Sequence, residues 1–142
     1  MNTKAAWAVL VGLLLLGAVG MPAGVQAEEM ARMVIQVSDN DTSKWNLALN
    51  NANNIQKDLG KDKVELEIVV FGPGIHMLKA ESEVGNRVAD AVGAGIKVMA
   101  CQNTMRNQKL TPDDMLTTVG YVPAGVVEIL RKQQQGFAYL RP

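Results

Sequence analysis

The chain has 142 residues, with 14 basic and 14 acidic side chains, a single cysteine and a single histidine. This length suits one domain with its own hydrophobic core, and a single cysteine excludes an internal disulfide bond. The charge is balanced and no basic patch in the sequence favours nucleic-acid binding, so we expect no nucleic-acid partner.

Residues 1–27 are predicted to be a cleavable signal peptide. Lys4 supplies a positive charge, Ala5–Gly20 is apolar, and Val25–Ala27 is a small-residue cleavage site. The apolar segment is shorter than the roughly 20 residues that span a membrane, and an uncleaved N-terminal anchor is the alternative interpretation. We therefore expect residues 28–142 to form a single domain that is periplasmic or secreted and has no membrane attachment after cleavage.

Apolar patterns in the first half of this domain predict a strand, a helix and a second strand. They cover Arg32–Val37, Trp45–Leu59 followed by Gly60, and Val64–Phe71. Asp39 and Asp41 lie in the turn before the helix. A calcium loop that began at Asp39 would need glycine at its sixth position and glutamate at its twelfth, and neither is present. A solvated loop is therefore predicted there.

The segment after the second predicted strand, Gly72–Met77, is predicted to be a loop. It contains two glycines around a proline, and it includes the only histidine, His76. This composition favours a tight turn, but it matches neither G-x-G-x-x-G nor a P-loop. A helix capped by Ser82 is expected next, and its apolar stripe consists of Val84, Val88, Ala91 and Val92.

Cys101 follows the short apolar run Ile96–Ala100, which predicts a buried strand. In open α/β sheets, chemistry gathers at the carboxyl ends of the strands, where helix-terminal N–H groups favour a thiolate. Asn103 and Thr104 are candidate N-cap residues for a following helical turn. Cys101 is therefore either a reactive thiol or a small residue that closes a core strand. A free thiol without a role is a liability in an exported protein, which favours the first interpretation.

The last part of the chain predicts shorter elements. They are a helix start at Thr111–Asp114, a strand at Val119–Val122, a helix that opens at Pro123 and ends at Gly136, and a strand at Phe137–Leu140. The buried side of the final helix is predicted to consist of Val126, Val127 and Leu130. The order of elements predicts a single-domain α/β fold with a mostly parallel sheet and helices on both faces.

Four ordered motifs in residues 32–142 carry a resemblance to a known family. They are Phe71–Gly74, Ala100–Met105, Leu110–Asp114, and Val122–Val126 running into Gln133–Tyr139. In these motifs the chain resembles the DsrE-like family, small α/β sulfur-relay proteins related to DsrE and DsrF. The resemblance implies flavodoxin-like layering, a homo-oligomer (trimer or hexamer), and a strand-end cysteine that carries sulfane sulfur as a persulfide. Cys101 is the only residue here that could take that role.

Two functions follow as hypotheses. The first is an exported thiol-based sulfur carrier, sulfurtransferase-like if it turns over, that exchanges sulfur with a donor or acceptor protein. In it Asn103, Thr104 and backbone N–H groups stabilise the thiolate, and His76 is a candidate proton acceptor. The second is a non-catalytic oligomeric module with a structural cysteine that binds a small molecule or a soft metal. The soft-ligand candidates are His76, Met77, Cys101 and Met105. We expect no cofactor and assign no metal site.

Overall fold

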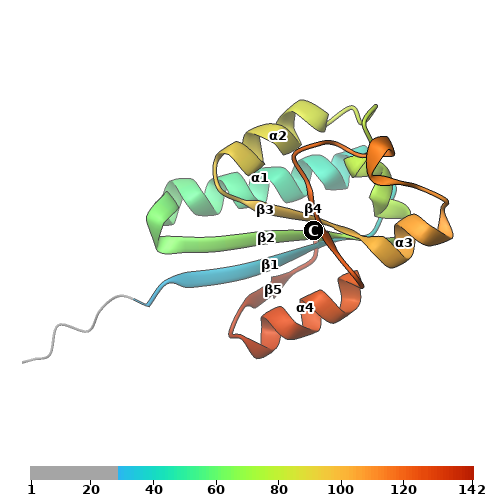
Figure 1. Ribbon diagram of the computed structural model, residues 1–142. Helices are drawn as coiled ribbons and strands as arrows, with labels where there is room; N and C mark the ends of the chain where they lie inside the picture. Colours follow the sequence, from blue (N-terminus) through green and yellow to red (C-terminus); the bar gives the residue numbers. More distant parts are fainter. Residues whose placement is uncertain (1–28) are drawn as a thin grey trace, which may run out of the picture.

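The computed structural model describes residues 29–142, and the predicted signal peptide lies outside the described residues. The elements, in chain order, are β1 (Ala31–Val37), α1 (Thr42–Leu59), η1 (Lys61–Lys63), β2 (Val64–Val70), η2 (Gly72–Leu78), α2 (Gly85–Gly93), β3 (Lys97–Cys101), α3 (Gln102–Asn107), η3 (Pro112–Asp114), β4 (Gly120–Val122), α4 (Gly125–Gln134) and β5 (Ala138–Leu140), where η marks a 3-10 helix (Figure 1). No helix in this range is both long and apolar enough to cross a membrane.

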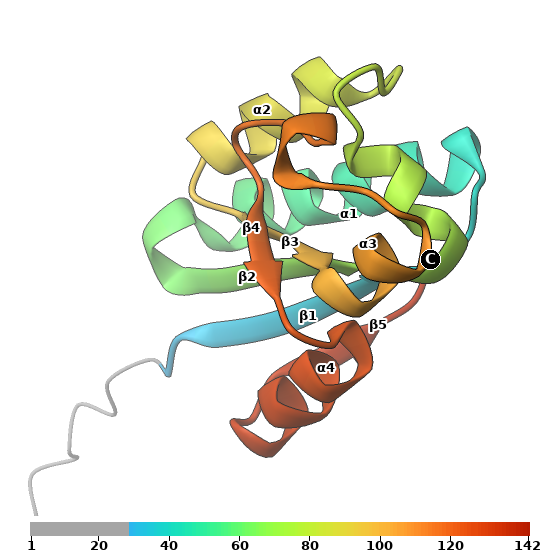
Figure 2. The same ribbon diagram turned by 45° about the vertical axis from the view of Figure 1, so that its right-hand side comes forward.

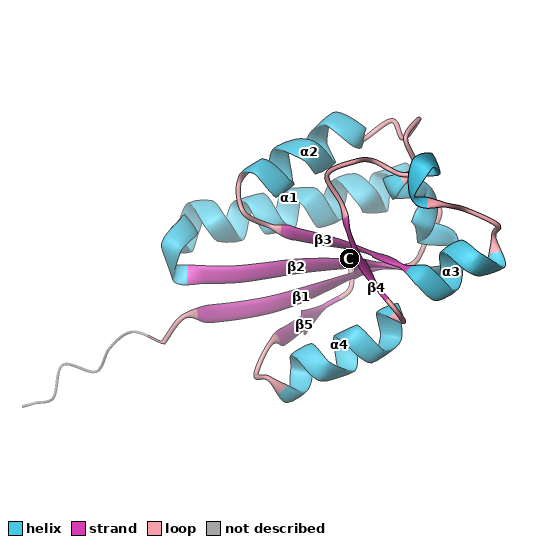
Figure 3. Cartoon of the chain, in the orientation of Figure 1, coloured by secondary structure: helices cyan, strands magenta, loops and turns pink. Residues whose placement is uncertain are grey.

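The strands of the described chain form one parallel sheet in the order β4-β3-β2-β1-β5. The chain steps outward from β1 to β4, and α4 then returns it to the other side of β1, where β5 pairs. Helices α1 and α2 lie on one face of the sheet and α4 lies on the opposite face (Figures 1, 2 and 3). The predicted α/β class and the helices on both faces are confirmed, and the sheet is entirely parallel.

The two faces of the sheet bury very different amounts of apolar surface. The face under α1 and α2 holds the main core, and its strand residues include Ile35, Leu66, Ile68, Val70, Val98 and Ala100. The face under α4 holds a small cluster of Val34, Val69, Ile129 and Phe137, with Phe71 packed against it. Val98 and Ala100 of β3 belong to the main core. Because successive strand side chains alternate between faces, the next residue, Cys101, lies on the opposite face, under α4.

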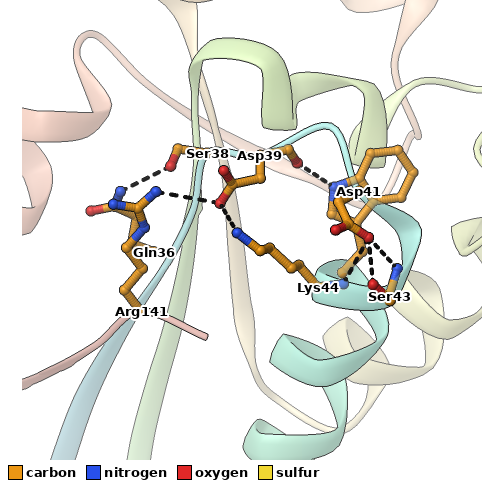
Figure 4. Close-up of polar contacts among 8 residues, drawn as sticks. Gln36, Ser38, Asp39, Asp41, Ser43, Lys44 and Arg141 are labelled. Atoms are coloured by element: carbon orange, nitrogen blue, oxygen red, sulfur yellow. Dashed lines mark hydrogen bonds and ion pairs between the residues drawn. The ribbon is translucent and has the colours of Figure 1, made fainter.

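Both aspartates of the turn between β1 and α1 bind other groups of the protein (Figure 4). Asp41 is the N-cap of α1, and its carboxylate accepts from the N–H groups of Ser43 at 2.9 Å and Lys44 at 3.4 Å. The Asp39 carboxylate pairs with Lys44 at 3.2 Å and with Arg141 at 3.4 Å. These contacts tie the end of the chain to the start of α1, so the two aspartates have structural partners here.

The segment after β2 was predicted to be a loop with a tight turn, and in the structure it is the 3-10 helix η2. It begins after Phe71 and runs over the end of β1. Gly74 is required by close packing, because an added Cβ would lie 2.7 Å from the carbonyl oxygen of Val37 and 3.0 Å from the Cα of Ser38. The segment is thus held against β1 at the carboxyl edge of the sheet.

The start of α2 differs from the prediction, whereas the predicted helix start at Thr111–Asp114 is confirmed as the short 3-10 helix η3. The N-cap of α2 is Val84, and the Ser82 hydroxyl accepts only the Val84 N–H, at 3.4 Å. The segment at Thr111 forms a capping box with Asp114, whose carboxylate accepts from the Thr111 N–H at 2.7 Å and from its hydroxyl at 2.9 Å. That cap supports a single 3-10 turn and no longer helix.

Helix α4 begins later than predicted and buries a different side. Ala124 is its N-cap, so Pro123 lies outside the helix. The apolar residues that were predicted to be buried are exposed, at 61% for Val126, 40% for Val127 and 55% for Leu130. The buried side consists of Gly125, Ile129 and Lys132. The prediction was wrong because the buried side carries Lys132, which forms an ion pair under the helix with Glu67 of β2 at 2.8 Å.

Candidate functional site

Cys101 lies where β3 ends and α3 begins, and it is the N-cap residue of α3. Its thiol is free, and the residue is only 4% exposed. It nevertheless belongs to neither of the two apolar clusters of the described chain. Cys101 is therefore a buried residue whose sulfur has hydrogen-bond donors beside it rather than a place in either apolar cluster.

The first turn of α4 supplies a hydrogen bond to the sulfur. The Gly125 N–H donates to Cys101 Sγ at 3.2 Å. Strand pairing sets this contact, because Cys101 pairs with Val122 and the chain then reaches Gly125 within three residues. The Asn103 N–H donates to the Pro123 carbonyl at 3.1 Å, which holds the start of α3 against the segment that leads into α4.

Thr104 supplies the second set of donors. Its hydroxyl oxygen accepts the Gly72 N–H at 2.9 Å, and the hydroxyl hydrogen-bonds to the Cys101 sulfur. Burial raises the pKa of the Cys101 thiol, but hydrogen bonds from the Thr104 hydroxyl and from the N–H groups of Gly125, Thr104 and Asn103 outweigh burial. The pKa therefore lies below its ordinary value, and the thiolate is favoured.

The residues predicted to act with Cys101 have different surroundings. Thr104 contacts the sulfur, whereas the Asn103 N–H donates to the Pro123 carbonyl and contributes least to the sulfur, and the exposed Asn103 side chain accepts from Arg106. Neither is the N-cap of α3, because Cys101 occupies that position itself. His76 is partly buried in η2, and in the described chain its side chain makes no hydrogen bond to Cys101. Its role as a proton acceptor stays a prediction.

The thioethers that were considered as soft-metal ligands are part of the main core. Met77 and Met105 are both buried there, among the apolar residues under α1 and α2. Among residues 29–142 there is no group of three or more His, Cys, Asp or Glu side chains that could hold a metal ion. The two methionines therefore have packing roles, as is common for this adaptable side chain.

Sequence reasoning missed Gly125, Gly72 and Phe71. Gly125 lies 24 residues after Cys101, so only the pairing of β3 with β4 brings the two together. The available indication was that all three residues lie in the family motifs Phe71–Gly74 and Val122–Val126. An added Cβ at Gly125 would lie 3.0 Å from Phe71 Cδ1, so a side chain there would crowd the Phe71 ring.

Comparison with known proteins identifies the family. The model of the DsrE/DsrF-like family matches residues 31–142. The chain belongs to the DsrE/DsrF-like family. This confirms the resemblance seen in the sequence motifs. A comparison of this DsrE/DsrF-like chain with curated proteins finds no match.

Solved structures with the same fold support this assignment. MTH1491 from Methanobacterium thermoautotrophicum, described as a protein of unknown function, is 35% identical, with a TM-score of 0.75 over 79% of this chain and 99% of that one. BT1422 from Bacteroides thetaiotaomicron is 15% identical, with a TM-score of 0.63 over 78% and 94% of the two chains. The ychN protein from E. coli is 9% identical, with a TM-score of 0.64 over 80% and 99%. The last two share the fold.

Proposed function

We propose that this DsrE/DsrF-like protein carries sulfane sulfur as a persulfide on Cys101. The observation that supports the proposal is the set of hydrogen-bond donors around the Cys101 sulfur, which lowers the pKa of the thiol despite its burial. The thiolate is the nucleophilic form of cysteine. A core cysteine that only filled space would have no need of these donors.

Both halves of the exchange use the same thiolate. To load, the Cys101 thiolate attacks the outer sulfur of a persulfide or polysulfide donor; a new S–S bond forms, the donor S–S bond breaks, and the donor leaves as a thiolate. To unload, an acceptor thiolate attacks the outer sulfur and Cys101 leaves as a thiolate. No net oxidation occurs in either step. A low pKa makes Cys101 a good leaving group, so the contacts of Thr104 and Gly125 serve the second step as well as the first.

The burial of Cys101 shapes this proposal. A sulfur in a residue that is 4% exposed reacts only when the groups above it move aside, because attack needs an approach along the S–S axis. We therefore include in the reaction a local opening that exposes the sulfur while the donors from Thr104 and Gly125 stay in place.

Intact mass spectrometry of the native protein tests the carrier function. Incubation with polysulfide should add about 32 Da, the mass of one sulfur, and a reductant should remove it. The mass of the protein as isolated reports any sulfur that Cys101 already carries. The carrier proposal fails if native Cys101 resists both polysulfide and iodoacetamide.

The second candidate is a non-catalytic oligomeric binding module with a structural cysteine. The burial of Cys101 favours it, since buried thiols are commonly inert. The iodoacetamide reaction separates the two functions, because only the carrier needs a thiol that reacts in the native state. Metal content of protein purified without a chelator tests a soft-metal ligand for this module.

We also propose that the protein is a homo-oligomer, a trimer or a hexamer. The family resemblance supports this, together with the exposed apolar side of α4, Val126, Val127 and Leu130. Exposed apolar patches of this kind mark interaction sites in many proteins. Light scattering at micromolar concentration and moderate salt should give the mass of a closed assembly. A mass close to that of one chain would contradict the proposal.

Export is the remaining proposal, and it concerns residues outside the described range. Cleavage after Ala27 would give a mature chain that begins at Glu28 and is periplasmic or secreted, because Val25–Ala27 has the small-residue pattern of a cleavage site. N-terminal sequencing of the protein from its native compartment measures this directly. A chain that starts at Met1 would rule out cleavage.

A further inference from the structure

The Phe71–Gly72 segment follows β2 directly and contacts two residues that donate hydrogen bonds to the Cys101 sulfur. They are Thr104, through its hydroxyl, and Gly125, through its N–H. The Gly72 N–H donates to the Thr104 hydroxyl at 2.9 Å. The Phe71 ring packs against Gly125, where an added Cβ would lie 3.0 Å from Cδ1 and 3.2 Å from Cγ. Phe71 and Gly72 thus contact Gly125 and Thr104, the two residues whose hydrogen bonds stabilise the Cys101 thiolate.

The contact from Gly72 fixes the direction of the Thr104 hydroxyl. A hydroxyl has one proton to donate and two lone pairs to accept with. Because the Gly72 N–H occupies a lone pair of Thr104 Oγ1, the hydroxyl proton is free to point to the Cys101 sulfur. Gly72 therefore keeps Thr104 a donor to the thiolate.

The contact from Phe71 fixes the position of Gly125. The φ angle of Gly125 is outside the left-handed region, so the backbone conformation does not require glycine there. The nearby Phe71 ring favours it, because an added Cβ would force the ring or the start of α4 to shift by a few tenths of an ångström. With no side chain at Gly125, the start of α4 packs directly on Phe71, and at that distance its N–H reaches Cys101 Sγ at 3.2 Å.

The segment is itself held firmly. The Phe71 N–H donates to the Val37 carbonyl at 3.1 Å, and the Gly74 N–H donates to the Ser38 carbonyl at 3.1 Å. The first carbonyl belongs to the last residue of β1 and the second to the residue that follows it, and β1 pairs with β2 along its whole length. Phe71 and Gly72 are therefore anchored to the two central strands of the sheet.

We propose that Phe71 and Gly72 form a positioning element that holds Gly125 and Thr104 against the Cys101 sulfur and so favours release of sulfur over its storage. The inference rests on the proposed carrier function. In a persulfide the negative charge moves to the outer sulfur, while these donors stay at the inner one. They stabilise the thiolate that leaves, so a persulfide on Cys101 is readily passed on.

The Gly125→Ala variant tests the Phe71 contact. Its Cβ would press on the ring and push the first turn of α4 away from Cys101. We expect the midpoint of the iodoacetamide rate against pH to rise by about one unit, the size of one lost hydrogen bond to a charged sulfur. Release of persulfide sulfur to a small thiol should slow by about tenfold. Gly93→Ala is the matched control, because an added Cβ at Gly93 meets nothing within 4 Å.

A second substitution separates positioning from general damage. In the Gly125→Ala background, Phe71→Ala removes the Cδ1 and Cγ contacts, and the pH midpoint should return at least halfway to that of the wild type. A Gly125→Ala midpoint equal to that of the wild type would overturn the proposal, and so would a raised midpoint that Phe71→Ala does not lower. Thermal unfolding of each variant confirms that it is folded.

A Thr104 pair tests the Gly72 contact in the same assay. Thr104→Ser keeps a hydroxyl that can accept the Gly72 N–H and donate to the sulfur, so its midpoint should lie closer to that of the wild type than the midpoint of Thr104→Val does. Thr104→Val removes the hydroxyl and should raise the midpoint; an unchanged midpoint would overturn this half of the proposal. These outcomes are distinct from failure of the carrier function, because wild-type protein that takes no sulfur from polysulfide would disprove the carrier whatever the midpoints show.

Discussion

Cys101→Ala should abolish the gain of about 32 Da that polysulfide produces, with the chain still folded. Cys101 is the only cysteine in the sequence, so no other thiol can hold a persulfide. The variant also removes the acceptor of the Gly125 N–H. An unsatisfied buried donor costs about 1–3 kcal/mol, which is the destabilisation that we expect.

Cys101→Ser is the matched control for the stability effect. Its hydroxyl can accept the Gly125 N–H, so its free energy of unfolding should lie closer to that of the wild type than that of Cys101→Ala does. It should nevertheless take up no sulfur. A mass increase that survives in both variants would show that sulfur binds elsewhere and would contradict a carrier role for Cys101.

The sequence predicted the fold because its apolar periods are strong. The three central strands carry apolar runs such as Ile68–Val70 of β2, which are typical of strands covered on both faces in a parallel sheet. The order of the strands and the register between them were not predictable, since they depend on contacts between distant segments.

For the site, the local sequence pattern was enough to identify Cys101 and Thr104. A predicted strand ends beside Cys101 and a predicted helical turn follows at once, so both residues were expected at the same edge of the sheet. The pattern did not locate Gly125 or Phe71, whose contacts depend on the packing of β4 and α4 against β3 and β2. His76 shows the limit of the same reasoning. A position at the same edge of the sheet does not imply hydrogen-bond reach.

The side of α4 that faces the sheet was mispredicted for an energetic reason. An apolar stripe usually marks the buried side of a helix, but here Lys132 is buried and three apolar residues are not. The Lys132 ammonium pairs with Glu67 at 2.8 Å and lies 4.8 Å above the Phe137 ring. The apolar pattern describes one residue at a time, so it does not reveal an ion pair between two residues that are far apart in the sequence.

Lys132→Met should destabilise the protein strongly, by about 3–5 kcal/mol, because it leaves the Glu67 carboxylate buried without its partner. Glu67 is 2% exposed, and its second oxygen, Oε1, already lacks a hydrogen-bond partner. Urea unfolding at a fixed protein concentration measures the effect. The control is Lys97→Met, which breaks the more exposed 2.9 Å pair with Glu65 and should cost less than about 1 kcal/mol.

The effect of Lys132→Met should also depend on pH. Burial raises the pKa of Glu67 above its ordinary 4.5, although hydrogen bonding and charge attraction from Lys132 oppose the rise. Loss of Lys132 removes that opposition and raises the pKa further. The folded variant then binds a proton more readily than the unfolded chain, so its stability falls as pH rises. Its deficit relative to the wild type should therefore be smaller at about pH 5 than at about pH 7.5.

A double variant decides whether the ion pair stabilises the fold or only specifies how α4 packs. Glu67→Leu combined with Lys132→Met replaces both charges with apolar groups and leaves neither of them buried alone. Such replacements are often neutral or stabilising, so the double variant should recover most of the stability that Lys132→Met loses. If it does, the pair contributes mainly to the register of α4, the helix that delivers the Gly125 N–H to Cys101. If the double variant is as unstable as Lys132→Met, the ion pair itself holds α4 to the sheet.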